Sequence, residues 1–325
     1  MALLREEYPS NEIESVSVKF SDSTDETDAS KKISEKFQTN NHVLEIDNFL
    51  EELPKAISIV KQPFWDLHWF YLVKKMSNLT NVFLSGDGGD ELFCGYTFRY
   101  KKFLELTTDN STTHEKILAY LNCHERDWVP DQEELFHQEN EFLWDDIYKI
   151  LKPHFDNSLS RLTQVLLADY NGKLIHNMQP LYQLIHEHFS VRNIAPIHNK
   201  ELLGYSCQLP INQKYDYISN SGKIVLLNLL QKFNVKSLVS SKKQGFSVNT
   251  INLWNSHGKR TFLHFFDKSR LVEDKIINPD WIAKHISKNN LDVRYVNKFL
   301  GILALEIWYR IFITNEVNPD EKLDF

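Results

Sequence analysis

The sequence contains few of the features that mark secreted or disulfide-stabilised proteins. Its 325 residues include only three cysteines, Cys94, Cys123 and Cys207, which are widely spaced and form no CxxC pair. An odd number of scattered cysteines is typical of a reducing compartment, so we expect no disulfide framework. Charged side chains at Arg5 and Glu6 interrupt the N-terminal segment, which lacks the pattern of a secretory signal. We therefore expect a cytoplasmic protein.

Long apolar runs and an excess of basic residues are also missing. The most apolar stretch, residues 299–305, ends at Glu306, whereas a helix needs about 20 apolar residues to cross a membrane. The chain has 37 Lys and Arg against 44 Asp and Glu, a formal net charge of −7. Nucleic acids require a basic binding face, so we expect neither nucleic acid nor a membrane as a partner. A small phosphate ligand needs only local positive charge or a bridging cation, and the net charge does not exclude it.

The apolar residues that are present, 42% of the chain, suffice for a sizeable core without a disulfide or a structural metal. In the first part of the chain, strand-like and helix-like segments alternate. Strands are predicted at residues 13–20, 42–46 and 81–84, and helices at residues 29–37, 49–60 and 68–76. Strands joined by helical crossovers are typical of a parallel sheet.

Beyond Tyr100 the pattern becomes helical. Strand signals are scarce, and residues 299–312 predict a buried helix because they are apolar nearly all round. The predicted fold class is therefore α/β, with a parallel sheet followed by a mostly helical half. We place the division near residue 105, so that residues 1–105 form the α/β part and residues 106–325 the helical part.

The most informative segment is an acidic, glycine-rich loop. Residues 84–93 read LSGDGGDELF and follow a predicted strand, at the edge of a parallel sheet where ligands bind. The glycines let a ligand approach the backbone. Because Asp87, Asp90 and Glu91 would repel a bare phosphate, a nucleotide here requires a bridging cation such as Mg²⁺. Taken alone, the loop also fits a plain Gly/Asp turn, the commoner case, or a calcium loop, although its spacing is not that of an EF-hand.

Several segments together carry a resemblance to a known family. Residues 84–100, LSGDGGDELFCGYTFRY, resemble the second signature of asparagine synthetases. Residues 241–248, SKKQGFSV, are similar to the family's Lys-x-Gly-Phe segment, and residues 300–312 to its C-terminal helix. Residues 62–66, QPFWD, look like its Glu-Pro-Phe-x-Asp run. The resemblance implies a fold of the adenine-nucleotide alpha-hydrolase type, the Rossmann-like PP-loop fold.

The family's chemistry gives the expected function. Its members activate a carboxylate with ATP as an acyl-adenylate, release pyrophosphate, and let ammonia or an amine attack. The resemblance therefore implies a carbon–nitrogen ligase of asparagine biosynthesis, related to amidotransferases, with ATP and Mg²⁺ as cofactors. Its partners would be aspartate or a related acid and a donor of ammonia or an amine.

The resemblance first assigns the nucleotide site. Ser85 and Gly86 match positions that contact ATP, and Gly88 and Gly89 belong to the same loop. Val18, near the end of the first predicted strand, matches a position that lines the adenine pocket.

The resemblance also assigns the residues that carry the chemistry. Asp90 matches a Mg²⁺-binding carboxylate, and Asp87 falls where asparagine-forming members carry an acidic residue near the reacting centre. Lys243 matches the lysine that steadies the charge developing during acyl transfer, and Lys242 is the weaker candidate. A fixed cation suits that role because charge grows in the transition state.

Two departures from the family pattern bear on the function. The family's first strand ends in Ser-Gly-Gly-x-Asp-Ser, which holds pyrophosphate and a second Mg²⁺; this sequence is not present here, nor is the glutaminase domain. We expect that Met1 is not the true start, that a glutaminase or N-terminal partner chain supplies the missing part, or that the chain is a remnant. Between residues 169 and 199, the family's Asp-Arg pair and Glu-x-Arg-x-Pro-Phe-Leu-Asp run are largely replaced, although Pro196 remains. The substrate is therefore not fixed as aspartate.

Other interpretations stay open beside the resemblance. His186 and His188, with His176 and His198 nearby, suggest zinc, but residues two apart do not share a helix face, and solvated or capping histidines are the simpler interpretation. A non-catalytic relative would bind a nucleotide or partner without turnover. A tRNA-modifying relative is disfavoured by the acidic charge.

Overall fold

The structure, a computed structural model, describes residues 1–20, 27–124, 128–238, 248–288 and 290–324. The chain folds into two compact units, each built from segments that are separated in sequence. Unit 1 comprises Met1–Asp47, His68–Lys101 and Asp169–Ser247, and unit 2 comprises Asn48–Leu67, Lys102–Ala168 and Val248–Phe325. The domain division predicted at residue 105 stays a prediction.

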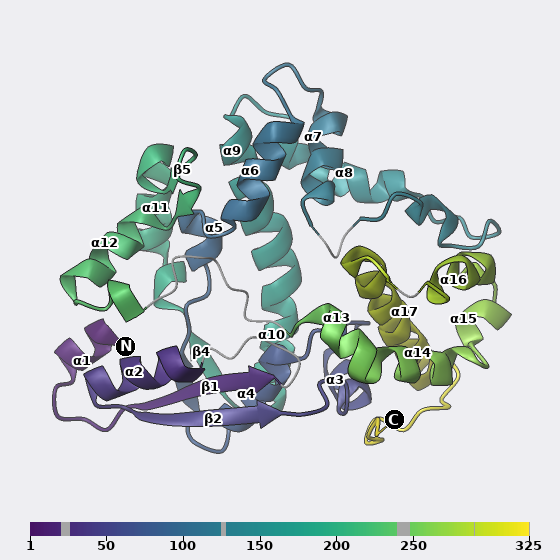
Figure 1. Cartoon of the computed structure of the whole chain (residues 1–325), viewed down its shortest axis with the longest axis horizontal. Helices are drawn as coiled ribbons and strands as arrows, with labels where there is room; N and C mark the ends of the chain where they lie inside the picture. Colours follow the sequence, from purple (N-terminus) through teal and green to yellow (C-terminus); the bar gives the residue numbers. More distant parts are fainter. Residues whose placement is uncertain (21–26, 125–127, 239–247, 289, 325) are drawn as a thin grey trace. The chain divides into compact units, whose positions relative to one another are not determined.

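The strands lie in unit 1 (Figure 1). β1 (Glu14–Phe20) pairs with β2 (Asn40–Ile46), and β3 (Val82–Leu84) pairs with β4 (Arg192–Ile194), both in parallel. The short strands β5 (Tyr215–Asp216) and β6 (Ser221–Gly222) pair antiparallel. The helical segments are α1 (Ala2–Glu7), α2 (Thr27–Phe37), α4 (His68–Met76), α5 (Gly89–Phe93), the start of α6 (Thr97–Leu106), η2 (Asp169–Met178), α10 (Gln179–His188), η3 (Pro196–His198), α11 (Lys200–Gln208), η4 (Ile211–Gln213), α12 (Ile224–Lys232) and η5 (Lys236–Leu238).

The predicted mixed α/β fold and its parallel strand pairing are confirmed. The described residues do not, however, form one continuous parallel sheet. Their parallel strands make two separate two-stranded sheets, and β3 and β4 are only three residues long. Both sheets contact the same helix, α4. This helix packs against β1, and the ring of its Trp69 lies 5.9 Å from the ring of Phe83 in β3. Since α4 also packs against α10, which contacts β4, one helical layer supports both strand pairs.

Unit 2 is helical within the described residues. Its segments are α3 (Leu53–Val60), the end of α6, α7 (Thr113–Asn122), η1 (Gln132–Glu134), α8 (Trp144–Phe155), α9 (Arg161–Ala168), α13 (Thr250–Leu253), η6 (Trp254–Gly258), α14 (Lys259–Phe266), α15 (Arg270–Glu273), α16 (Pro279–Ile286) and α17 (Val293–Phe312). The buried C-terminal helix predicted from residue 299 is confirmed as part of α17, which packs against α3, α13, α14 and α15. None of the helices in the described part of the chain has the length and apolar character of a membrane span.

Glu306, in α17, is a buried carboxylate with a structural role. Its side chain is fully buried and accepts hydrogen bonds from Ser269 Oγ at 2.7 Å and from Arg310 Nε at 2.6 Å. The backbone N–H groups of Arg270 and Leu271 donate to the same carboxylate. Glu306 therefore satisfies the first N–H groups of α15, which have no partner inside the helix.

Candidate active site

The glycine-rich loop lies at the carboxyl end of β3, as predicted. The Ser85 N–H donates to the Ile194 carbonyl of β4 at 3.0 Å, which continues the ladder by one residue beyond the strands. α5 then begins at Gly89. Gly88 precedes it with φ of +85°, a left-handed conformation that only glycine adopts without strain. A Cβ at Gly86 would meet nothing within 4 Å, so the loop backbone there is open to a ligand.

A segment that begins in β4 holds three successive loop residues. Asn193 Nδ2 donates to Asp87 Oδ2 at 3.0 Å. A Cβ at Gly88 would lie 3.2 Å from His198 Cβ, and one at Gly89 would lie 3.5 Å from Ile197 Cδ1. The shape of the loop is therefore set by residues 193–198.

His198 is itself fixed by two hydrogen bonds. Its Nε2 bonds to the Tyr170 hydroxyl at 2.9 Å, and its Nδ1 to Gln179 Nε2 at 2.8 Å. Because the Gln179 amide nitrogen is a donor, Nδ1 is the acceptor of that bond. The fixed His198 side chain thus packs against Gly88 and leaves little room for a larger side chain there.

Asp87 is held at one of its two oxygens. Its Oδ2 accepts hydrogen bonds from Ser85 Oγ at 2.9 Å and from Asn193 Nδ2. Near it, burial lowers the pKa of His186, an effect that the negative charge of Asp87 opposes. Trp69 Nε1 donates to His186 Nε2 at 3.0 Å, which requires that nitrogen to be unprotonated. The carboxylate of Asp87 therefore faces neutral neighbours.

Asp90 forms an ion pair that the sequence did not predict. Lys223 Nζ lies 2.8 Å from Asp90 Oδ1, and the two side chains are 33% and 22% exposed. The pair depends on Gly95, because a Cβ there would lie 1.6 Å from Asp90 Oδ1 and 2.6 Å from Lys223 Cε. The Lys223 N–H also donates to the Phe93 carbonyl at 2.8 Å, which fixes the lysine backbone beside α5.

A buried charged cluster lies beside this ion pair. Arg99 and Asp169 are bonded at 3.1 Å with side chains 5% and 0% exposed, and the Tyr96 hydroxyl donates to Glu91 Oε1 at 2.6 Å. Lys173 Nζ lies 3.8 Å from the centre of the Tyr96 ring. Burial, with the nearby Arg99 charge, lowers the pKa of Lys173 to about 8. The cluster thus contains a second lysine on which the charges of Glu91 and Asp90 act.

The structure brings most of the predicted site residues together. Ser85, Gly86, Asp87 and Gly88 form the loop after β3, and Gly89 and Asp90 are the first two residues of α5. Val18 lies in the other parallel strand pair, opposite Leu44 of β2. Lys242 and Lys243 lie outside the described residues.

Sequence reasoning missed Asn193, His198 and Lys223 as parts of this site. For Lys223 a signal existed, since Gly222-Lys223 stands directly before an apolar helix, α12. For the other two, no local pattern distinguishes them from ordinary strand and loop residues.

The zinc interpretation finds no support in the described residues. No group of three or more His, Cys, Asp or Glu side chains in these ranges could hold a metal ion. His186 and His198 are instead occupied by Trp69, Tyr170 and Gln179.

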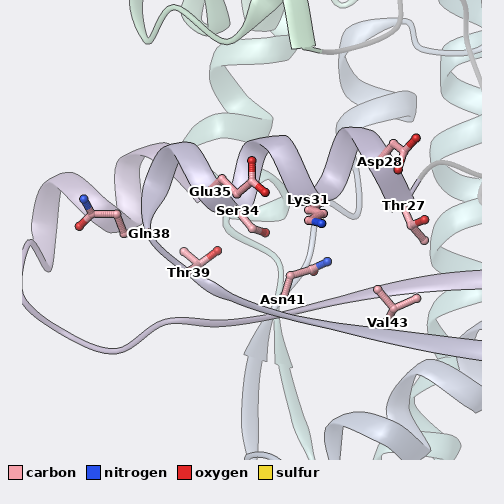
Figure 2. A pocket seen from close by; sticks show the side chains of 9 residues that line it. All are labelled: Thr27, Asp28, Lys31, Ser34, Glu35, Gln38, Thr39, Asn41 and Val43. Atoms are coloured by element: carbon pink, nitrogen blue, oxygen red, sulfur yellow. The ribbon is translucent and has the colours of Figure 1, made fainter.

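Two grooves of unit 1 have other linings. One, of about 470 Å³, lies between α2 and β2 and is shown in Figure 2. Its lining is mostly polar and comprises Thr27, Asp28, Lys31, Ser34, Glu35, Gln38, Thr39, Asn41 and Val43. A second, of about 490 Å³, includes His186 and Asn193. None of the predicted site residues lines either groove, so the assignment of the site rests on the loop.

A comparison with protein-family models shows to which family the chain belongs. The model of the asparagine synthase family matches residues 1–310. The chain belongs to the asparagine synthase family. A search of curated proteins gives no match. Family membership shows an ATP-dependent amide ligase in general, of a kind that typically uses Mg²⁺.

The loop of this asparagine synthase family chain fits a nucleotide held through a cation. Asp90 is the kind of oxygen ligand that Mg²⁺ prefers, and Lys223 beside it is a point charge suited to a phosphate oxygen. The backbone at Gly86, four residues before Asp90, is open, because a Cβ there would meet nothing within 4 Å. The fit concerns one metal ligand, Asp90, because the described residues contain no group of three or more His, Cys, Asp or Glu side chains that could hold a metal ion.

Proposed function

We propose that the chain is the synthetase part of an ATP-dependent amide ligase. It activates a carboxylate, aspartate or a related acid, as an acyl-adenylate and transfers the acyl group to ammonia or an amine. The observation that carries the proposal is the Asp90–Lys223 pair at the end of the glycine-rich loop, in a chain of the asparagine synthase family.

In the first step, the residues around the loop bind ATP and stabilise the leaving pyrophosphate. Asp90 would hold Mg²⁺, which neutralises phosphate charge when bound. Lys223 would then turn from Asp90 to the phosphate oxygens, with Ser85 and Gly86 against the nucleotide. Val18 is proposed to line the adenine pocket, and Lys243 to stabilise the charge that develops during acyl transfer.

In the second step, Asp87 receives a proton. The amine nitrogen attacks the acyl carbon, a carbon–nitrogen bond forms, and the carbon–oxygen bond to AMP breaks. The proton lost by the amine passes to the Asp87 carboxylate, and AMP leaves with the electron pair. Asp87 is suited to this because one of its oxygens is fixed by Ser85 and Asn193.

The proposed fold is the PP-loop type, completed by residues that this sequence does not contain. β1 and β3 both rest on α4, so a further strand and its Ser-Gly-Gly-x-Asp-Ser loop would join the two parallel pairs into one sheet. We propose that a glutaminase or other N-terminal partner chain supplies them.

The test is substitution of Lys223 in the full-length native protein. Lys223→Met removes the cation beside Asp90, and we expect Mg²⁺-dependent AMP formation to fall by roughly 100-fold, the scale of losing one charged group that stabilises a transition state. Lys200→Met is the matched control, because Lys200 is exposed at the start of α11. Equal activity of the two variants would contradict the proposed role of the Asp90–Lys223 pair.

A further inference from the structure

Asn193 has an unusual hydrogen-bonding state beside Asp87. Its Nδ2 donates to Asp87 Oδ2 at 3.0 Å, and a carboxylate can only accept, so the amide must turn its NH₂ group toward Asp87. Its Oδ1 then points elsewhere, where it is buried and has no hydrogen-bond partner among the described residues. A buried acceptor without a partner is costly, and such groups in native proteins call for an explanation.

Within the described ranges, the hydrogen bonds from Ser85 and Asn193 to the Asp87 side chain both go to Oδ2. Its Oδ1 is therefore not held by Ser85 or Asn193. Two residues joined by one hydrogen bond, Asp87 and Asn193, thus each keep a side-chain oxygen, Oδ1, outside the bonds that join them to each other and to Ser85. An amine nitrogen has several N–H donors. It is therefore the ligand whose hydrogen-bonding groups complement these oxygen acceptors.

We propose that Asn193 is a positioning residue for the amine step, holding Asp87 in place and accepting an N–H of the attacking amine at its own Oδ1. This inference rests on the proposed function. It assigns a role to a residue that no motif of the sequence marks. It also explains the orphaned oxygen, because the bound amine would satisfy it.

The hydrogen bond from Asn193 to Asp87 predicts a pH dependence that a purely structural role of Asn193 would not produce. In Asn193→Asp, two carboxyl groups face each other where an amide donor stood, and both cannot ionise at that distance. At lower pH a shared proton restores a donor between them. In Asn193→Ala no protonation can restore it.

The experiment measures both half-reactions of the full-length native protein, with aspartate and ammonium chloride as probes. ATP–pyrophosphate exchange reports carboxylate activation, and amide formation reports the amine step. In Asn193→Ala we expect exchange within about threefold of wild type, and amide formation lowered by roughly 10- to 100-fold, the range for a hydrogen bond to a charged group. The ammonium concentration for half-maximal rate should rise.

The pH series separates positioning from folding. Relative to wild type at each pH, the deficit of Asn193→Asp should shrink between pH 8 and pH 6, while that of Asn193→Ala stays constant. Arg192→Ala, an exposed neighbour, should leave both half-reactions unchanged. Exchange that falls as much as amide formation, or parallel pH profiles for the two Asn193 variants, would overturn the inference. A wild type without exchange would contradict the proposed function and this inference with it.

Discussion

Gly95 is the residue on which the Asp90–Lys223 pair depends. The Asp90 carboxylate and the Lys223 side chain both cross the space that a side chain at position 95 would fill. Any side chain there must push one of the two charged groups away. The site therefore contains a glycine whose importance comes from close approach rather than from its backbone angles.

Gly95→Ala is expected to separate Asp90 from Lys223. Mg²⁺-dependent AMP formation should fall to about the level of Lys223→Met, on the order of 100-fold below wild type. The matched control is Gly204→Ala, because a Cβ at Gly204 in α11 meets nothing within 4 Å. That change should be neutral or stabilise by about 0.5–1 kcal/mol, since alanine favours a helix. Unimpaired activity of Gly95→Ala would show that the pair is dispensable.

Lys173 gives a prediction for alkaline pH. Burial and Arg99 lower its pKa to about 8, whereas the unfolded chain keeps the ordinary value near 10.4. Between these values the unfolded state binds more protons, so this group makes the free energy of unfolding rise with pH. Relative to Lys173→Met, the wild type should gain about 1–3 kcal/mol between pH 7.5 and pH 10. Urea unfolding at several pH values measures this, and an unchanged difference would contradict it.

At the scale of single residues, the sequence could predict those site residues that are close together in the chain. Asp87 and Asp90 stand in one continuous string, and the glycines between them already indicate a ligand loop. Asn193 and Lys223 reach the loop from distant parts of the chain, and their contacts exist only after folding. No local spacing encodes such contacts.

At the scale of the elements, Asp131, which precedes η1, makes a pH-sensitive contact with α16 and α17. Asp131 accepts a hydrogen bond from Tyr295 at 2.8 Å and lies 2.7 Å from His285 Nε2 and 3.0 Å from Lys284 Nζ. Burial alone would raise the pKa of Asp131, but the hydrogen bonds from Lys284, His285 and Tyr295 outweigh it and hold that pKa well below its usual range. One carboxylate thus ties three helical segments together.

Asp131→Asn is expected to weaken unit 2. The free energy of unfolding at pH 7 should fall by about 2–4 kcal/mol, because a charge-assisted network loses its acceptor. In the wild type this contribution is present above the unfolded-state pKa near 3.9 and is lost as the pH falls below it, whereas the variant lacks that loss. The control is Asp109→Asn, whose side chain is 90% exposed and should matter by less than about 1 kcal/mol. Equal acid sensitivity of wild type and Asp131→Asn would contradict the assignment.

The elements themselves were predicted unevenly. α4 has the predicted bounds, His68–Met76, because its apolar face has a clear helical period. The helix predicted from residue 49 begins at Leu53, with Pro54 in its first turn, where proline costs no hydrogen bond. β4 was missed because three residues cannot display an alternating pattern, yet it carries Asn193.

For the whole molecule, family membership and the α/β class are confirmed, while several expectations stay predictions. These are the cytoplasmic location, the partner chain, the division at residue 105, the cofactors, and the roles of all the predicted site residues, from the glycine-rich loop to Val18 and Lys243. The location and the partner chain depend on compartment and assembly, which a local sequence pattern does not encode, and the roles of the site residues depend on ligands that a local pattern only implies. The single parallel sheet of the PP-loop fold likewise stays a proposal, because the described residues form two separate parallel strand pairs.

The central claim is that the protein turns ATP over at the loop around Asp90. It is tested by measuring Mg²⁺-dependent AMP and pyrophosphate release from the full-length native protein, in wild type and Asp90→Asn, with nucleotide binding measured in parallel. We expect stoichiometric AMP and pyrophosphate from the wild type and a loss of roughly 100-fold or more in Asp90→Asn. Nucleotide binding without AMP release by the wild type would contradict the account and establish the non-catalytic interpretation.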